Sequence, residues 1–215
     1  MGRKEDIRES IKNKKMRKVM SRMEELEKIL SEKVEKDEEW DFLEIEDVKL
    51  VYVGKLKANL KKLPPQAILL AILVKYFEKF KEVKITKFTK ITFEVEKKVF
   101  EPILSGPLLS FKADNFGPFT REIYDILGFL QNLDLVKIEK EGDKTEIILT
   151  DKGVEVFRER IKKEIPEVVL KLIEIVVERY GSLDHDELLH RVYKEYPEFA
   201  GKSVVRDKYY QGVSY

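Results

Sequence analysis

The sequence of 215 residues predicts a mainly α-helical protein that contains one small β-hairpin. Most of the chain after residue 65 carries apolar side chains three and four positions apart, the spacing of one helix face. Residues 136–149 differ, because two short strand-like runs flank the turn Glu141-Gly142-Asp143. One amphipathic helix precedes this hairpin and another helix follows it. The order of helix, two-stranded wing and helix predicts a winged-helix-like core, and such cores bind partners more often than they catalyse reactions.

We expect three regions along the chain. Residues 1–63 are predicted to form a long charged N-terminal helix and an irregular segment, residues 64–165 the winged-helix-like core, and residues 166–215 a C-terminal helical extension with a tail. The N-terminal helix spans residues 5–36 and carries an apolar seam with coiled-coil spacing. The seam consists of Met16, Val19, Met23, Leu26 and Leu30. It fits either a homodimer through this helix or a helix that packs on its own domain.

The core begins at a double proline at residue 64, which favours a helix start. Residues 66–80 are apolar on three sides, so we predict a buried central helix there. A second helix is predicted from about Thr86, with Thr86 or Thr89 as its cap, although its β-branched residues leave a strand as the alternative. Residues 101–116 are predicted to be a loop with an extended piece.

The helix before the hairpin is predicted to begin at Gly117-Pro118, because proline suits a first helical turn. Its expected apolar face is Phe119, Ile123, Ile126, Leu127, Leu130 and Leu133. The two strands are predicted at Val136–Lys140 and Thr145–Leu149, with Gly142 supplying the positive φ of a tight turn.

Three further helices complete the expected fold. Thr150 is predicted to cap the first of them, and Pro166 to begin the second, which Gly181 ends. The third follows Ser182 and carries acids in its first turn, as the helix dipole favours.

Composition excludes several kinds of chemistry. The chain has no cysteine, and its two histidines, His185 and His190, are five positions apart and so lie on different helix faces. No phosphate loop, nucleophile elbow, dinucleotide fingerprint or zinc spacing is present. We therefore expect no catalytic activity, no metal and no cofactor. The chain lacks a membrane-length apolar run and an apolar signal core, which favours a cytoplasmic protein with no membrane partner. Charged residues make up 39% of the chain, a composition typical of thermophiles.

The first functional hypothesis is a DNA-associated transcriptional regulator, in which the helix before the wing enters the major groove of double-stranded DNA and the wing contacts phosphate. It is supported by a basic N-terminal block, with nine Lys or Arg against three acids between Arg3 and Arg22. The candidate contacts are Lys12, Lys14, Lys15, Arg17, Lys18, Lys87, Lys90, Arg121, Lys140 and Lys144. Against it stand a net charge of only +1 and acids interleaved among the candidate cations.

The second hypothesis is a protein-binding module whose aromatic residues Phe116, Phe119 and Tyr124 are covered by a partner protein. A third is an assembly protein that oligomerises through the N-terminal helix. The residues alone leave DNA and protein nearly balanced as the target.

A family resemblance adds to these readings. The runs KITKFTKITFEVEKK, FKADNFGPFTREIYDILGFLQNLDLVKIE and IILTDKG occur in this order, followed by a Tyr-Gly and a Tyr-Pro pair near the end. Over residues 66–199 this set resembles the YwgA-like proteins and the related Panacea domain of SocA-type antitoxins. The resemblance implies a mostly helical, winged-helix-like fold without catalytic activity. It implies an antitoxin that contacts a toxin, an adaptor for proteolysis or a DNA-associated regulator. The charged N-terminal helix departs from the family pattern.

Overall fold

The computed structural model describes residues 60–104, 106–142 and 144–203. The chain divides into two units, Met1–Ala58 and Asn59–Tyr215, and the described residues belong to the second. The predicted helix at residues 5–36 and its apolar seam lie outside the described residues, so they stay predictions.

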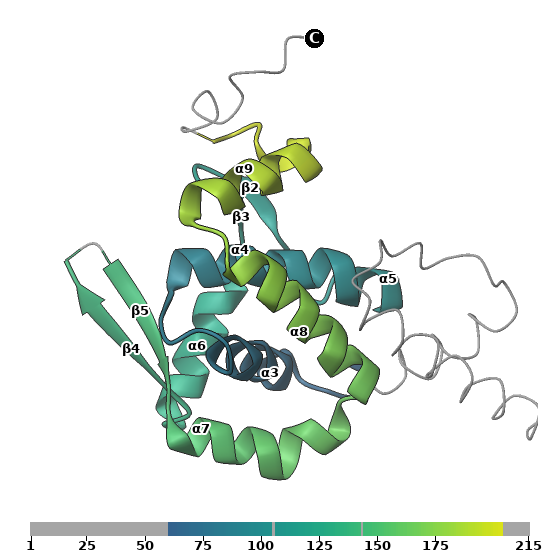
Figure 1. The fold of residues 1–215 in the computed structure, drawn as a ribbon, viewed down its shortest axis with the longest axis vertical. Coiled ribbons are helices and arrows are strands. Elements are labelled where there is room, and N and C mark those ends of the chain that lie inside the picture. Colours follow the sequence, from purple (N-terminus) through teal and green to yellow (C-terminus); the bar gives the residue numbers. More distant parts are fainter. Residues whose placement is uncertain (1–59, 105, 143, 204–215) are drawn as a thin grey trace, which may run out of the picture. The chain divides into compact units, whose positions relative to one another are not determined.

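The described unit is mainly helical, with small antiparallel sheets (Figure 1). Its α-helices are α3 (Pro65–Phe77), α4 (Ile85–Val95), α5 (Glu101–Leu104), α6 (Glu122–Asn132), α7 (Asp151–Val156), α8 (Glu167–Gly181) and α9 (His185–Glu195). Its other helical turns are η1 (Glu96–Phe100), η2 (Phe157–Ile161), η3 (Lys162–Glu164) and η4 (Pro197–Phe199). Its strands are β1 (Val83–Lys84), β2 (Lys112–Asp114), β3 (Gly117–Phe119), β4 (Val136–Glu141) and β5 (Lys144–Leu149).

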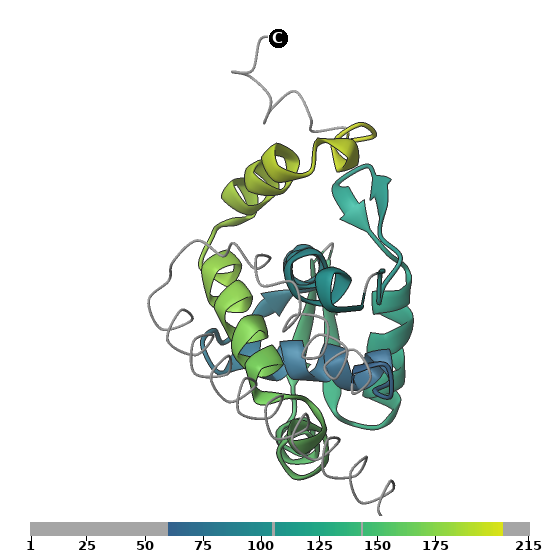
Figure 2. The same ribbon diagram turned by 90° about the vertical axis from the view of Figure 1, so that its right-hand side faces the viewer.

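Helix α3 is the centre of the core, as its apolar sequence predicts. Pro65 occupies the first turn, where its missing N–H costs no hydrogen bond. An unbroken run from Ala67 to Val74 is buried, because α6, α8, η2 and α7 contact the helix on different sides. Figures 1 and 2 show α3 running through the middle of the unit.

The hairpin β4–β5 confirms the predicted wing strands within one residue at each end. Val136 pairs with Leu149 and Glu141 with Lys144, and Gly142 at the turn has φ of +58°. Strand β1 adds to the other side of β5, which gives the sheet order β1-β5-β4. The wing is thereby fixed to the chain between α3 and α4.

Helix caps hold the hairpin and the last helices in place, and the cap at Thr150 confirms the prediction. The Thr150 hydroxyl accepts a hydrogen bond from the Gly153 N–H at 3.0 Å, and it donates to the carbonyls of Asp134 and Leu135. Asp184 forms a capping box with Glu187 at the start of α9. Pro166 directly precedes α8, which ends at Gly181.

The second predicted helix is confirmed as α4, and the strand alternative is wrong. Its predicted caps are also wrong, because Lys84 occupies the cap position and makes no side-chain cap. The Thr89 hydroxyl instead donates to the Ile85 carbonyl within the helix at 2.8 Å. The predicted loop at residues 101–116 begins with the short helix α5 and includes β2.

The prediction that Gly117-Pro118 begins a helix is wrong. Gly117 has φ of +85°, which a right-handed helix excludes, and it forms β3 with Pro118 and Phe119. Strand β3 pairs with β2 in a second hairpin, and α6 begins only at Glu122. Both views place this β2–β3 hairpin and α9 at the same end of the unit (Figure 2). A turn signal and a helix-start signal coincide in Gly-Pro, and here the turn prevails.

Candidate functional site

Five of the basic residues predicted to contact phosphate lie outside the described residues. They are Lys12, Lys14, Lys15, Arg17 and Lys18. Their assignment to a nucleic-acid interface stays a prediction.

Helix α4 and the turn η1 that follows it carry a stripe of charged side chains at the spacing of one helix face, and the fold buries the middle of it. We call Lys87, Lys90, Glu94 and Lys98 the polar stripe. The elements that contact α4 and η1 include α8, α9 and β3, which come later in the chain. From the sequence alone, such a stripe predicts a surface exposed to water. In the structure, segments from later in the chain pack against it.

Two of the predicted DNA-contacting lysines belong to this stripe and bind backbone carbonyls. The Lys87 ammonium donates to the carbonyls of Gly181 and Leu183, both at 2.7 Å, at the turn between α8 and α9. The Lys90 ammonium donates to the Pro118 carbonyl at 2.6 Å, and the residue is only 5% exposed. The prediction that Lys90 contacts phosphate is therefore corrected, and Lys87 holds a turn rather than an open surface.

Burial also changes the proton affinity of these two amines. Desolvation lowers the pKa of Lys90 to about 8, with the charge of Asp114 acting in the opposite direction. Desolvation lowers the pKa of Lys87 as well, partly offset by the charge of Asp184. The buried Lys90 amine therefore lacks the hydrated environment of a surface phosphate contact.

The hairpin presents a mixture of charges rather than a cationic face. Lys140 lies opposite Thr145, and Lys144 lies opposite Glu141. Two acids, Glu139 and Glu146, face each other next to the Lys140–Thr145 pair. All the hairpin lysines are exposed, but acids alternate with them along both strands, so the wing offers phosphates little net attraction.

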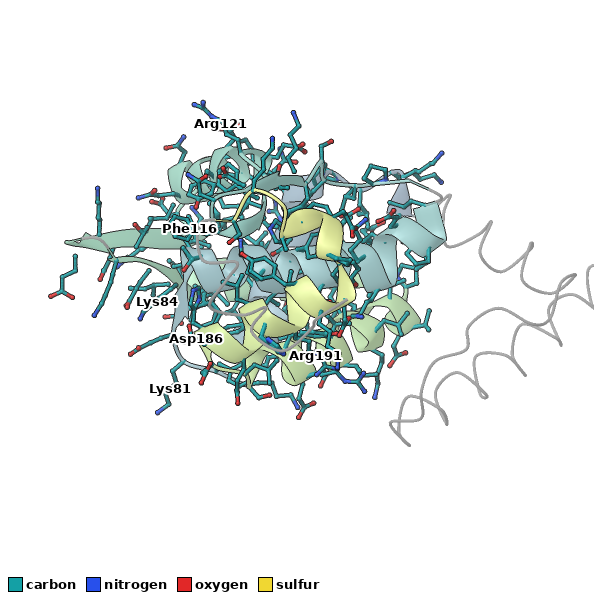
Figure 3. All side chains as sticks on the ribbon, turned by 90° about the horizontal axis from the view of Figure 1, so that it is seen from above. Lys81, Lys84, Phe116, Arg121, Asp186 and Arg191 are labelled. Carbon is teal, nitrogen blue, oxygen red and sulfur yellow. The ribbon has the colours of Figure 1, made fainter. Side chains whose placement is uncertain are left out.

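Arg121 is an exposed predicted DNA contact among the described residues. Its side chain is 87% exposed and extends away from the fold (Figure 3). The guanidinium lies 3.9 Å from the carboxylate of Asp125, one turn later in α6, so an acid accompanies this cation too.

A buried carboxylate next to the polar stripe fixes the loop before β2. Glu96 is 2% exposed, and its carboxylate accepts hydrogen bonds from the N–H groups of Leu108 at 2.6 Å and Leu109 at 3.3 Å. Burial raises the pKa of Glu96 to about 7, although the two N–H groups favour the ionised form. Nothing in the sequence marks this glutamate as different from its charged neighbours.

The three aromatic residues predicted to bind a protein lie around β3, and we call them the aromatic surface. Phe116 sits at the turn of the β2–β3 hairpin and is 59% exposed (Figure 3). Tyr124 is 38% exposed, and its ring centroid lies 5.5 Å from that of the half-buried Phe119. The structure thus brings Phe119 and Tyr124 into contact and places Phe116 at the opposite end of the same short strand.

Two more apolar side chains are exposed where α6 ends. Phe129 is 49% exposed and Leu133 is 44% exposed. Leu133 was expected on the buried face of the helix, and the structure corrects this, because Leu133 follows the last helical residue. The Leu130 carbonyl then accepts from the Leu135 N–H, and Asp134 adopts φ of +59°, so the chain turns sharply there.

Catalytic and metal-binding features are sparse in the part of the chain that the structure describes. A hollow between β1, the start of α4 and α9 mixes charges of both signs; its lining is Tyr76, Glu82, Lys84, Thr86, Lys87, Glu146 and His185. Among the described residues, no group of three or more His, Cys, Asp or Glu side chains is arranged to hold a metal ion. None of the described helices is both long and apolar enough to cross a membrane.

Comparisons with known proteins assign no family. No protein-family model matches the chain, and no curated protein matches it.

Proposed function

We propose that this protein is a non-enzymatic docking module that binds another protein through the aromatic surface. The single observation that carries the proposal is the exposure of Phe116 and Tyr124 on a short, well-anchored hairpin and helix. Exposed aromatic side chains on a rigid support are characteristic of residues that dominate protein interfaces. They present a large apolar area and lose little side-chain entropy on binding.

The order of elements supports a winged-helix-type core for this module. Helix α3, strand β1, helix α4, helix α6 and the hairpin β4–β5 follow one another, and β1 pairs with the second strand of the hairpin. Between α4 and α6 the chain inserts residues 96–121, which include the β2–β3 hairpin. The aromatic surface lies at the junction of this insertion with α6, the helix that precedes the wing.

The charge distribution favours protein over nucleic acid as the target of the described unit. Lys87 and Lys90 bind carbonyls, Arg121 lies beside Asp125, and the hairpin lysines alternate with acids. Nucleic-acid affinity depends on several cations that neutralise phosphates together. The described face has few such cations without an acid beside them.

The matched experiment compares two pairs of exposed apolar residues. Tagged protein is recovered from its native host as wild type, as Phe116→Ser with Tyr124→Ser, and as Phe129→Ser with Leu133→Ser. We expect a stoichiometric partner with the wild type, a loss of at least about tenfold with the first variant, and little loss with the second. Equal losses in both variants, or a wild type that carries no partner, would contradict the proposal.

A second candidate is binding of double-stranded DNA through the basic block between Arg3 and Arg22. Its test is an electrophoretic shift at rising salt, with wild type and a variant in which Lys12, Lys14, Lys15, Arg17 and Lys18 become Gln. A shift that weakens steeply with salt and disappears in the variant supports DNA binding. No shift of any duplex at low salt removes it.

The resemblance to YwgA-like and SocA-type proteins stays a prediction. A homodimer through the N-terminal helix also stays a prediction, and light scattering on a chain that lacks residues 1–36 tests it. If the truncated chain has the same number of subunits as the full chain, that helix is excluded as the dimer contact.

A further inference from the structure

A buried carboxylate with an unsatisfied oxygen lies where α4, α8 and α9 meet. Glu94 of α4 is 0% exposed. Its Oε2 atom is 3.5 Å from the Tyr196 hydroxyl, which donates to it, and 3.7 Å from the Lys98 ammonium. Its Oε1 atom is buried and has no hydrogen-bond partner among the described residues. A buried ionised carboxylate normally has both oxygens satisfied, so this site favours the protonated acid.

The strong donors at this junction donate to a second carboxylate, that of Glu195 in α9. Its oxygens accept from the Lys98 ammonium at 2.6 Å, the Arg191 Nε at 2.9 Å and the Tyr180 hydroxyl at 3.3 Å. The pKa of Glu195 is lowered: its partial burial acts to raise it, but the hydrogen bonds and charges of Lys98 and Arg191 outweigh that effect. Glu195 is therefore the ionised member of the pair.

The groups that face Glu94 come from every element packed around it. They are Lys98 from η1, Tyr180 from α8, Arg191 and Glu195 from α9, and Tyr196 after α9. Burial raises the pKa of Glu94 to about 7, Glu195 acts in the same direction, and Lys98, Tyr180 and Arg191 act against them. The geometry and the electrostatics agree that Glu94 keeps a proton near neutrality that an exposed glutamate would release.

Helix α9 also supports the aromatic surface. A side chain at Gly117 would stand 2.9 Å from the Tyr193 ring and 3.3 Å from Leu189, so α9 packs directly behind the β2–β3 turn. The Tyr193 hydroxyl donates to Ser203 Oγ at 2.6 Å, and the Ser203 hydroxyl donates to the Asn115 carbonyl at 3.2 Å. Displacement of α9 would remove the backing of the turn that presents Phe116.

We propose that the packing of α9 against α4 is linked to one proton on Glu94, so that α9 opens more often as the pH rises from mildly acidic values towards neutrality. Opening exposes the carboxyl group to water, where it ionises more readily. Loss of the proton therefore shifts the equilibrium from the closed form towards the open form. Regulation of docking by this movement rests on the proposed function. The linkage of α9 to the proton does not.

The closing experiment measures α9 itself, without any partner. Amide hydrogen exchange of residues 185–195 is followed in the full chain between pH 5 and pH 8 and corrected for the intrinsic pH dependence of exchange. For one linked proton, we expect protection to fall by about tenfold per pH unit between the ordinary and the raised pKa, and to level off above it. Amides of α3 serve as the internal reference.

Two variants make the test decisive. Glu94→Gln keeps the shape of the side chain and cannot ionise, so its α9 protection should not depend on pH. Glu96→Gln removes the other buried acid of this region and should leave the pH dependence of α9 unchanged. The inference is overturned if wild-type α9 protection is flat, or if Glu94→Gln retains the slope. If Glu94→Gln does not fold, the titration of the Glu94 carboxyl carbon by NMR replaces it, and a normal midpoint near pH 4.5 would overturn the inference.

Proposed docking is then tested separately at the two ends of this pH range. If α9 protection depends on the Glu94 proton but no partner binds at Phe116, the proposed docking function is refuted and the link between α9 and the proton stands. A partner bound equally at both pH values would show that the movement does not regulate docking.

Discussion

Helices α4 and α6 show opposite arrangements of polar and apolar side chains. The polar stripe of α4 is covered by segments that follow much later in the chain, and its charged groups bind carbonyls, carboxylates and hydroxyls. Helix α6 buries a narrow apolar face but leaves Tyr124 and Phe129 exposed. Buried charges require specific partners and so fix the segments around them. Exposed apolar groups have no such requirement within the chain and are available to a partner.

The difference teaches how this fold builds a rigid support for a binding surface. Two charged side chains of α4 and η1 each hold a segment without regular hydrogen bonding of its own: Glu96 holds the loop before β2, and Lys87 holds the turn between α8 and α9. The β2–β3 hairpin is attached at Pro118 through Lys90. The four predictions that follow test this comparison, beginning with the largest expected effect.

Among the buried charged residues of α4 and η1, Glu96 should lose the most stability on substitution. Glu96→Ala removes the acceptor of the buried Leu109 N–H and of the part-buried Leu108 N–H, so we expect a loss of about 3 kcal/mol in the free energy of unfolding. Glu122→Ala is the matched control, because its carboxylate accepts from the Ser110 N–H at 3.1 Å in an exposed contact. That variant should lose less than about 1 kcal/mol in urea unfolding. Equal losses would show that burial does not separate the two contacts.

The buried amine of Lys90 should give a distinct pH dependence of stability. Its pKa is about 8 in the folded protein and 10.5 ordinarily, so between these values the unfolded chain binds the additional proton. Stability from this group therefore rises with pH across that window, and the penalty is fully present below pH 8. The total change is on the order of 3 kcal/mol. Unfolding measured from pH 7 to pH 10.5 should show this rise relative to Lys90→Met; parallel curves would contradict it.

The exposed face of α6 should tolerate a larger side chain. A Cβ at Gly128 of α6 would meet nothing within 4 Å, whereas one at Gly181 would stand 2.5 Å from the Phe80 ring. Gly128→Ala should stabilise the protein by about 0.5–1 kcal/mol because glycine disfavours a helix interior. Gly181→Ala should destabilise it. Thermal unfolding of both variants checks the signs, and destabilisation by Gly128→Ala would mean that this face of α6 is covered.

The aromatic surface should contribute least to stability. Phe116→Ser and Tyr124→Ser should each change the free energy of unfolding by no more than about 0.5 kcal/mol, since the exposed rings add little to the core. Circular dichroism during urea unfolding measures this directly. A loss of several kcal/mol would identify these rings as structural and would remove the basis for docking.

Local signals in the sequence predicted much of the fold. The apolar run of α3, the strands on both sides of Gly142 and the cap at Thr150 all depend on residues close together in the chain. The exposure of Phe116 and Tyr124 was also predicted, as part of the protein-binding hypothesis. The insertion that contains β2 and β3 was not, because a three-residue strand has too little pattern to recognise.

The sequence by itself determined the elements, since periodicity, turn chemistry and capping act between near neighbours. The tertiary structure alone decided which charged faces are buried. Lys90 and its acceptor Pro118 are 28 residues apart, and Lys98 and its acceptor Glu195 are 97 apart. A polar stripe on a helix has the same spacing whether water or another helix covers it. Only the packing of β3, α8 and α9 against α4 and η1 covers most of the stripe and leaves the aromatic surface outside.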